Sequence, residues 1–196
     1  MSRRSCIWNT VLLLLLTLAS SVAQGAALDR KSGGLRELDG SPARLFSEKG
    51  EGFLAFVFVR TDCPVSNAYA PEVKRLCKRF SSQGVRFWIV YQADETAPEI
   101  GQHLREYDYP CGALRDTDLQ FTKRAKVHVT PEAALFRATG ELLYHGRIDD
   151  RYAALNQVRP KAKRHDFEAA LTAAIEGKPV PVASGPAVGC LIEGAQ

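Results

Sequence analysis

The sequence predicts an α/β domain with a central mixed sheet flanked by helices, and three features indicate this fold class. Residues 53–59 and 85–90 are runs of apolar, aromatic and β-branched residues, which is typical of strands buried on both faces. Between them, residues 64–82 carry apolar side chains three and four positions apart, the spacing of a helix packed on a sheet. Such strand–helix–strand units form right-handed crossovers, and a hairpin later in the chain makes the sheet mixed.

The other elements follow from the same patterns, with Gly, Pro or polar residues between them. Asp94 and Glu95 are expected to cap the helix that follows them, and residues 151–163 are expected to be irregular. The sequence further predicts a helix over 98–107, an extended segment over 109–114, a short helix over 118–125, a hairpin of strands over 127–136 and 142–148, and a terminal helix over 165–176.

Length and charge limit the possible functions. The chain has 196 residues, of which 45% are apolar and 24% charged, as expected for one globular domain. Its net charge is +4, and removing Arg3 and Arg4 with the leader described below reduces this to about +2. So small an excess gives no electrostatic basis for binding nucleic acid.

Residues 1–27 have the pattern of a signal peptide. Arg3 and Arg4 precede an apolar run, and Ser21-Val22-Ala23 satisfies the small-x-small rule for cleavage. The run is interrupted by polar residues and is short for a membrane span, so contact with a membrane is expected only if the leader is retained. We therefore predict an exported protein, periplasmic or secreted, with a domain over 28–178 and an extended C-terminal tail over 179–196.

Cys63 is the strongest candidate for a catalytic residue. It ends the first apolar run and is followed by Pro64, a residue favoured at the first position of a helix. Cys63 would therefore be the N-cap, where unpaired amide groups and the helix dipole favour the thiolate. A thiolate is the nucleophilic form of cysteine. The alternative is a small buried residue that merely ends a strand.

Four short segments add to this interpretation. Thr61-Asp62-Cys63-Pro64-Val65-Ser66-Asn67 and Val129-Thr130-Pro131-Glu132, together with Gly146–Asp150 and Gly189-Cys190, resemble the thioredoxin-fold redoxin family, in particular exported bacterial proteins related to alkyl hydroperoxide reductase and thiol-specific antioxidant. The resemblance implies a thioredoxin-like fold over about residues 35–192. It also implies a cis peptide bond at Pro131, and a substrate-binding wall formed by Thr130 and Pro131 opposite Pro64 and Ser66.

The sequence also departs from each branch of that family. Ser66 stands where thioredoxins have their second cysteine, so no disulfide within the motif is possible. Phe56 and Arg60 replace the proline and threonine of peroxiredoxins, and Asn67 replaces the second cysteine of copper-carrying relatives.

A partner for Cys63 must come from elsewhere in the chain. Cys77 lies fourteen positions further along the same helix, about 21 Å away at 1.5 Å per residue, and is expected in the core. Cys111 is expected to be buried beside an extended segment. Cys190 lies in the tail, which can span about 40 Å, so Cys190 is the best candidate to resolve an oxidised Cys63. An external thiol, with Cys190 as filler in an anchored tail, remains the alternative.

Other polar residues give weaker signals. His128 precedes the Thr-Pro pair and could approach Cys63, and Arg60 could stabilise its thiolate. Asp149 and Asp150 have the composition of a metal site but are expected to form a turn. We predict no cofactor and no metal.

We therefore predict that the protein is an exported thiol-based oxidoreductase that performs thiol–disulfide exchange or peroxide reduction, with Cys63 and Cys190 as catalytic residues. Its partners would be protein thiols and disulfides or hydroperoxides, with an external thiol as reductant. The alternative is a redox-inactive module of the same fold that binds partner thiols, or holds copper through Cys63 and His128.

Overall fold

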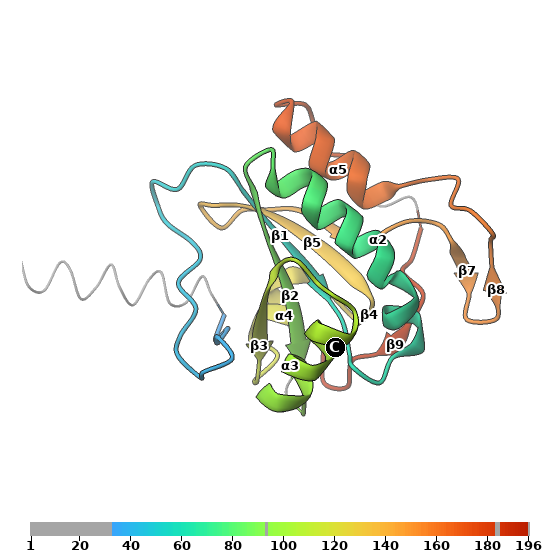
Figure 1. The fold of residues 1–196 in the computed structure, drawn as a ribbon. Helices are drawn as coiled ribbons and strands as arrows, with labels where there is room; N and C mark the ends of the chain where they lie inside the picture. Colours follow the sequence, from blue (N-terminus) through green and yellow to red (C-terminus); the bar gives the residue numbers. More distant parts are fainter. Residues whose placement is uncertain (1–32, 93, 183–184, 196) are drawn as a thin grey trace, which may run out of the picture.

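The computed structural model describes residues 33–92, 94–182 and 185–195. The predicted leader, residues 1–27, lies outside the described residues. No helix in the described ranges is long and apolar enough to cross a membrane. The elements are β1 (Phe53–Phe58), α2 (Pro64–Ser81), β2 (Val85–Gln92), α3 (Ala97–Glu106), β3 (Gly112–Asp116), α4 (Gln120–Ala125), β4 (Val129–Thr130), β5 (Glu132–Arg137), β6 (Leu142–Gly146), β7 (Tyr152–Ala154), β8 (Gln157–Val158), α5 (Asp166–Ile175) and β9 (Cys190–Leu191) (Figure 1).

The central sheet is mixed, as the sequence predicts. Its strand order is β3-β2-β1-β5-β6, with β1, β2 and β3 parallel and with β5 and β6 antiparallel to their neighbours. β1 lies in the centre and pairs with β2 on one side and β5 on the other. Since a central strand is covered on both faces, β1 has the continuous apolar sequence from which it was predicted.

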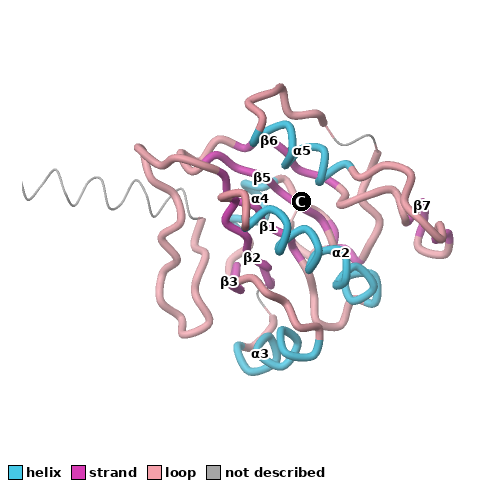
Figure 2. Tube along the Cα trace, turned by 45° about the horizontal axis from the view of Figure 1, so that its top comes forward, coloured by secondary structure: helices cyan, strands magenta, loops and turns pink. Residues whose placement is uncertain are grey.

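Successive residues of β1 enter two separate cores. Ala55 and Val57 face a cluster that includes residues of α2, α3 and α5. Leu54, Phe56 and Phe58 face a second cluster, built from α4 and the N-terminal segment 35–46. Figure 2 shows α2 and α5 together over one face of the sheet, with α4 on the other. The two layers hold the C-terminal end of β1, where Cys63 follows, in a fixed position.

The structure differs from the sequence prediction in three places. The strand expected over 127–136 is divided at Pro131 into β4 and β5, and β4 does not join the central sheet. Residues 151–163, expected to be irregular, contain the short hairpin β7–β8. Thr96, and not Asp94 or Glu95, caps α3, through a reciprocal capping box with Glu99.

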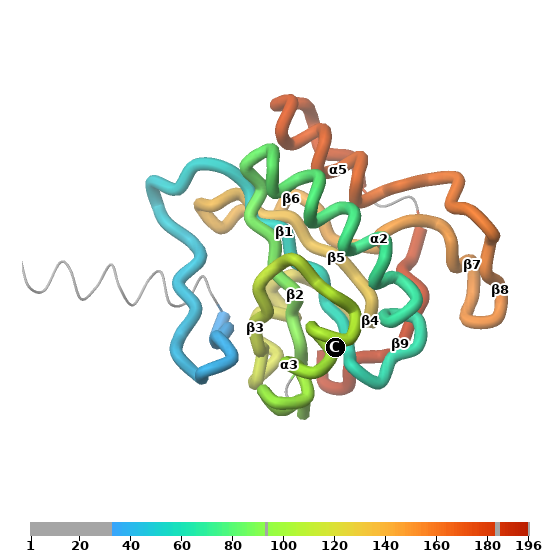
Figure 3. Tube along the Cα trace, viewed as in Figure 1, coloured from blue at the N-terminus to red at the C-terminus, as the bar shows by residue number. Residues whose placement is uncertain are grey.

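The C-terminal tail returns to the N-terminal end of α2. Its strand β9 pairs antiparallel with β4, with Cys190 opposite Thr130 and Leu191 opposite Val129. Figures 1 and 3 show β9 beside β4, beneath the start of α2. Ile192 is buried in the second core and anchors the end of this strand. The described part of the tail, residues 185–195, thus crosses the site of Cys63.

Candidate active site

Cys63 occupies the N-cap of α2, as the sequence predicts. Its backbone is extended, Pro64 begins the helix, and its Sγ accepts a hydrogen bond from the Ser66 amide at 3.5 Å. The buried strand before it and the proline after it place the sulfur against the first turn. The sulfur therefore faces the unpaired amide groups of the helix, where negative charge is stabilised.

The Thr130–Pro131 loop lies against Cys63. The peptide bond between these two residues is cis, as expected from the family resemblance. Cys63 Sγ lies 3.2 Å from the Thr130 carbonyl oxygen, to which its thiol donates. The loop is supported from below by Glu132, whose Oε2 accepts hydrogen bonds from the amides of His128 and Val129. Glu132 is buried, and this burial raises the pKa of its carboxyl group.

Cys190 is the cysteine that meets Cys63. Their sulfur atoms lie 2.7 Å apart, and both are free thiols. Cys63 is fully buried beneath the tail, whereas Cys190 is partly exposed. Cys77 is buried in the core, as predicted, and its thiol interacts with that of Cys111 instead. Cys190, which the reach of the tail favoured over Cys77 and Cys111, is therefore the cysteine that lies beside Cys63.

The pKa values of the two thiols are shifted in opposite directions. Burial raises the pKa of Cys63, but its interactions with Cys190, with the amide and side chain of Ser66 and with the side chain of Thr130 outweigh burial, so the net pKa is lowered. The hydroxyls of Ser66 and Thr130 are buried and have no other hydrogen-bond partner. Burial, together with the hydrogen bond to Cys63 and its charge, raises the pKa of Cys190 to about 12. Cys63 is thus the more acidic thiol of the pair.

A buried carboxylate positions the loop before Cys63. Glu95 accepts hydrogen bonds from the Thr61 amide at 2.6 Å and from the Gln92 amide at 3.2 Å. It is 5% exposed, and burial raises its pKa. The expectation that Glu95 caps α3 was wrong because its side chain turns away from that helix to hold the Cys63 loop.

A chain of hydrogen bonds missed by the sequence analysis reaches the same loop. Asn67 Nδ2 donates to the Thr61 carbonyl at 3.0 Å, and Asn67 Oδ1 lies 2.9 Å from His103 Nε2. Because Oδ1 is an acceptor, His103 carries its proton on Nε2 and accepts through Nδ1 from the Tyr91 hydroxyl at 2.8 Å. Burial lowers the pKa of His103, which favours this neutral form. A lone histidine gives no spacing signal, so the sequence did not reveal it.

Arg60 and His128 do not have the roles considered from the sequence. The Arg60 guanidinium pairs with Asp62 at 2.9 Å and Asp94 at 3.1 Å, and it is not among the groups that shift the pKa of Cys63. The His128 side chain is exposed, and its carbonyl accepts a hydrogen bond from the Ile192 amide. His128 thus holds the tail through its backbone.

The predicted turn at Asp149 and Asp150 is engaged in structural hydrogen bonds. Asp149 Oδ1 accepts from the Tyr69 hydroxyl at 2.5 Å and from the Arg151 amide, and it lies near Glu72 and His165. Asp150 accepts from two backbone amides of the 163–164 segment. Both oxygens of Glu72 also bond to an arginine, so this group has no free set of ligands.

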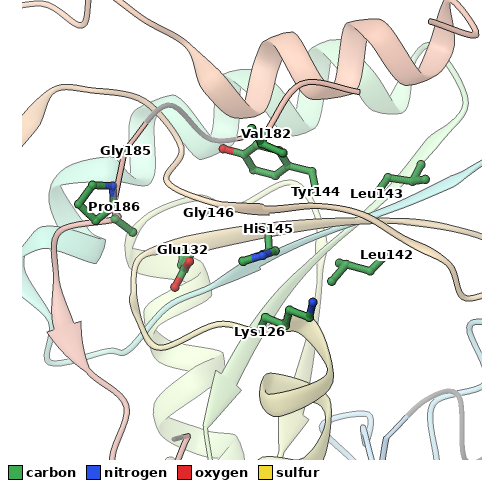
Figure 4. A pocket seen from close by; sticks show the side chains of 11 residues that line it. Lys126, Glu132, Leu142, Leu143, Tyr144, His145, Gly146, Val182, Gly185 and Pro186 are labelled. Carbon is green, nitrogen blue, oxygen red and sulfur yellow. The ribbon is translucent and has the colours of Figure 1, made fainter. Parts of the chain in front are cut away.

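A pocket of about 390 Å³ lies beside the site, between β6 and the tail. Figure 4 shows Glu132, His145 and Lys126 along one side of it. Neither Cys63 nor Cys190 lines this pocket. The cysteine pair lies instead at the junction of α2, β4 and β9, so we place the candidate active site there.

This geometry defines the class of protein. A helix that begins after an N-cap cysteine, facing a cis-proline loop on a mixed sheet, is the arrangement of the thioredoxin-like fold, and solved structures agree. The chain matches an uncharacterized conserved protein from Geobacillus kaustophilus with a TM-score of 0.68 and 26% identity, over 81% of this chain and 86% of that chain. A hypothetical protein from Sinorhizobium meliloti matches with a TM-score of 0.68 and 24% identity, over 81% and 88%.

A third match has a described activity. A secreted Mycobacterium tuberculosis disulfide oxidoreductase, homologous to Escherichia coli DsbE, matches with a TM-score of 0.50 and 19% identity, over 74% of this chain and 98% of that chain. No family model and no curated protein matches the sequence. The chain therefore has the thioredoxin-like fold that its sequence predicts, and its activity has to be argued from the site.

Proposed function

We propose that this protein is an exported thiol–disulfide oxidoreductase in which Cys63 is the nucleophile and Cys190 the resolving thiol. The observation that carries the proposal is the 2.7 Å separation of the two sulfur atoms at the N-terminus of α2. The leader-like residues 1–27 support export, and the matched secreted oxidoreductase has the same fold.

The first step is attack on a substrate disulfide. The Cys63 thiolate bonds to one substrate sulfur, the substrate S–S bond breaks, and the other substrate sulfur leaves as a thiolate that takes a proton. The product is a mixed disulfide between Cys63 and the substrate. Cys63 reacts first because its pKa is lowered, whereas that of Cys190 is raised to about 12.

Formation of the mixed disulfide makes the Cys190 thiol more acidic. Part of the raised pKa of Cys190 comes from its hydrogen bond to Cys63 and from the charge of that thiolate. Both causes disappear once Cys63 is in a mixed disulfide, so Cys190 then loses its proton more easily. Its thiolate attacks Cys63 Sγ, expels the second substrate sulfur as a thiolate that is then protonated, and closes the Cys63–Cys190 disulfide.

The net reaction reduces one substrate disulfide to two thiols and oxidises the two protein thiols. An external dithiol restores them by the reverse steps, becoming a disulfide itself. Disulfide exchange fits the site better than peroxide reduction. The position at which peroxiredoxins carry their threonine holds Arg60, whose guanidinium is engaged by Asp62 and Asp94.

Trapping the mixed disulfide tests this assignment. With glutathione disulfide as substrate, Cys190→Ser is expected to accumulate a glutathionyl adduct on Cys63, since no thiol is left to resolve it. The wild type should instead form the Cys63–Cys190 disulfide, and Cys63→Ser should form neither. Cys111→Ser is the matched control and should behave as the wild type. Peptide mass mapping distinguishes these products, and adducts confined to Cys77 or Cys111 would exclude the proposed roles.

A further inference from the structure

The tail covers the nucleophile. Cys63 is fully buried, and its sulfur lies 2.7 Å from that of Cys190 in β9, which pairs only with β4 among the described strands. The pairing consists of Thr130 opposite Cys190 and Val129 opposite Leu191, continued by a hydrogen bond from the Ile192 amide to the His128 carbonyl at 3.0 Å. A protein substrate therefore cannot reach Cys63 while β9 is in place.

Without the tail, β4 would be an open strand edge. The Thr130 backbone and the His128 carbonyl, which face β9, would then be free to pair with any extended segment, while the Val129 amide stays bonded to Glu132. A segment bound in the register of β9 would bring its own residue to the place of Cys190, next to Cys63 Sγ. The edge of β4 is thus a site for an extended polypeptide with a cysteine at that position.

The residue before that cysteine is restricted to glycine. A Cβ atom on Gly189 would lie 1.9 Å from the Thr130 carbonyl oxygen and 2.6 Å from its carbon. These are backbone atoms of the cis-proline loop and cannot swing aside, as the end of a flexible side chain could. The same oxygen contacts Cys63 Sγ. The restriction to glycine is therefore steric, and it applies where β9 passes Cys63 Sγ.

We propose that the edge of β4 selects substrate proteins in which a glycine directly precedes the disulfide-linked cysteine, and that residues 188–192 of the tail are an internal copy of that segment. The inference rests on Cys63 being the nucleophile. A substrate enters by replacing β9, and its cysteine, in disulfide linkage, is attacked by Cys63. The returning tail brings Cys190 to the mixed disulfide and displaces the reduced substrate.

Peptides with the sequence of residues 187–193 provide the probe. The heptapeptide Ala-Val-Gly-Cys-Leu-Ile-Glu, with its cysteine linked to thionitrobenzoate, is compared with the same peptide in which alanine replaces glycine. Both are reacted with two full-length double variants, Gly189→Ala/Cys190→Ser and Gly185→Ala/Cys190→Ser. The second is the control, because a Cβ on Gly185 meets only the end of the flexible Arg147 side chain. Transfer of the peptide to Cys63, measured by mass spectrometry, is the readout.

Two results are expected. The glycine peptide should transfer several-fold faster to the Gly189→Ala variant than to the Gly185→Ala control, because the tail of the former cannot seat on β4. In the Gly189→Ala variant, the glycine peptide should also transfer about tenfold or more faster than the alanine peptide, as for other sites that exclude one extra carbon. Equal rates for the two peptides, or for the two variants, would overturn the inference.

A small disulfide separates this inference from the proposed function. Dithiobis(nitrobenzoic acid) has no peptide backbone and no residue in the Gly189 position. If it modifies Cys63 while the two peptides react equally, Cys63 is still a reactive thiol and only the Gly-Cys site is disproved. If it fails to modify Cys63 in both double variants, the proposed function and this inference are both overturned.

Discussion

Helix α2 places two cysteines in different environments, Cys63 at its N-cap and Cys77 within the helix. Cys63 precedes the first turn, where its sulfur accepts from the Ser66 amide and lies beside two unpartnered hydroxyls. Cys77 lies within the helix, where backbone amides are already bonded, and its closest polar neighbours are Cys111 and the Ser81 hydroxyl at 3.9 Å. Position on the helix, and not residue type, determines which sulfur faces amide donors.

The partner thiols differ as well. In each pair the contact lowers the pKa of the α2 cysteine and raises that of its partner, Cys190 or Cys111. Cys190, however, is on a two-residue strand of the tail, whereas Cys111 directly precedes β3 of the central sheet. The tail strand is held by its pairing with β4 and by Ile192 in the second core, whereas β3 is a strand of the central sheet. The two thiol pairs therefore differ in where the partner is held, on a short strand of the tail for Cys63 and beside the central sheet for Cys77.

The largest expected effect is on turnover. Cys63→Ser should lower the rate of disulfide reduction by at least about 100-fold, as removal of a nucleophile does. Cys77→Ala should leave the rate within about twofold. Insulin reduction with dithiothreitol as reductant measures both, and circular dichroism verifies that each variant is folded. A strong loss in Cys77→Ala with a folded protein would show that the second pair also takes part.

The parts of the site that could be predicted are those determined by nearby residues. A buried strand followed by Cys63-Pro64 predicts an N-cap cysteine, because the strand, the proline and the helix are adjacent in the chain. The capping box at Thr96 and Glu99 is also a local motif, but the sequence analysis assigned the cap to Asp94 and Glu95 without considering it. Reading the Thr-x-x-Glu spacing would have corrected that assignment.

The parts that were missed depend on distant residues. Strands β4 and β9 have two residues each and show no periodic pattern, so only their meeting in the fold reveals the pairing. Glu95 is 34 positions from the Thr61 amide that it holds, and His103 is 36 positions from Asn67. Hydrogen bonds across such separations depend on the docking of α3 beside α2, which single-sequence patterns do not specify.

Removal of the Ser66 hydroxyl tests whether the start of α2 lowers the pKa of Cys63. Ser66→Ala deletes a donor that lowers the pKa of Cys63, so less thiolate is present at neutral pH. Alkylation of Cys63 near pH 7 should slow by up to about tenfold, the equivalent of one hydrogen bond to a charged group. The curve of rate against pH should move to higher pH. Ser81→Ala, at the other end of α2, is the control and should leave the curve unchanged.

A change in pH tests the hydrogen bonds through which His103 of α3 connects to Asn67, near the Cys63 end of α2. Burial lowers the pKa of His103 in the folded state, so stability is lost as pH falls from the ordinary histidine value of about 6.5 through the folded pKa. Protonated Nδ1 cannot accept from Tyr91, which costs about 1 kcal/mol for the lost hydrogen bond.

Urea unfolding at pH near 7.5 and near 5 measures this loss. His103→Gln does not titrate, and its stability should therefore fall less between the two pH values than that of the wild type. Buried Glu95 has the opposite sign, because its raised pKa adds stability as pH falls, and it is common to both proteins. The difference between the two proteins therefore isolates His103, and equal falls would disprove its role.

The smallest effect is expected at Arg60, the cation that lies nearest to Cys63 in the sequence. Its guanidinium bonds to Asp62 and Asp94, and its side chain is 22% exposed, so solvent and two carboxylates already neutralise its charge. It acts on Cys190, whose pKa it lowers slightly against the effect of burial, and not on Cys63. Arg60→Gln should therefore change the alkylation rate of Cys63 by less than about twofold, since exposed ion pairs contribute little. A larger fall would mean that the Cys63 thiolate depends on a side-chain cation, and the start of α2 would then be insufficient to explain its reactivity.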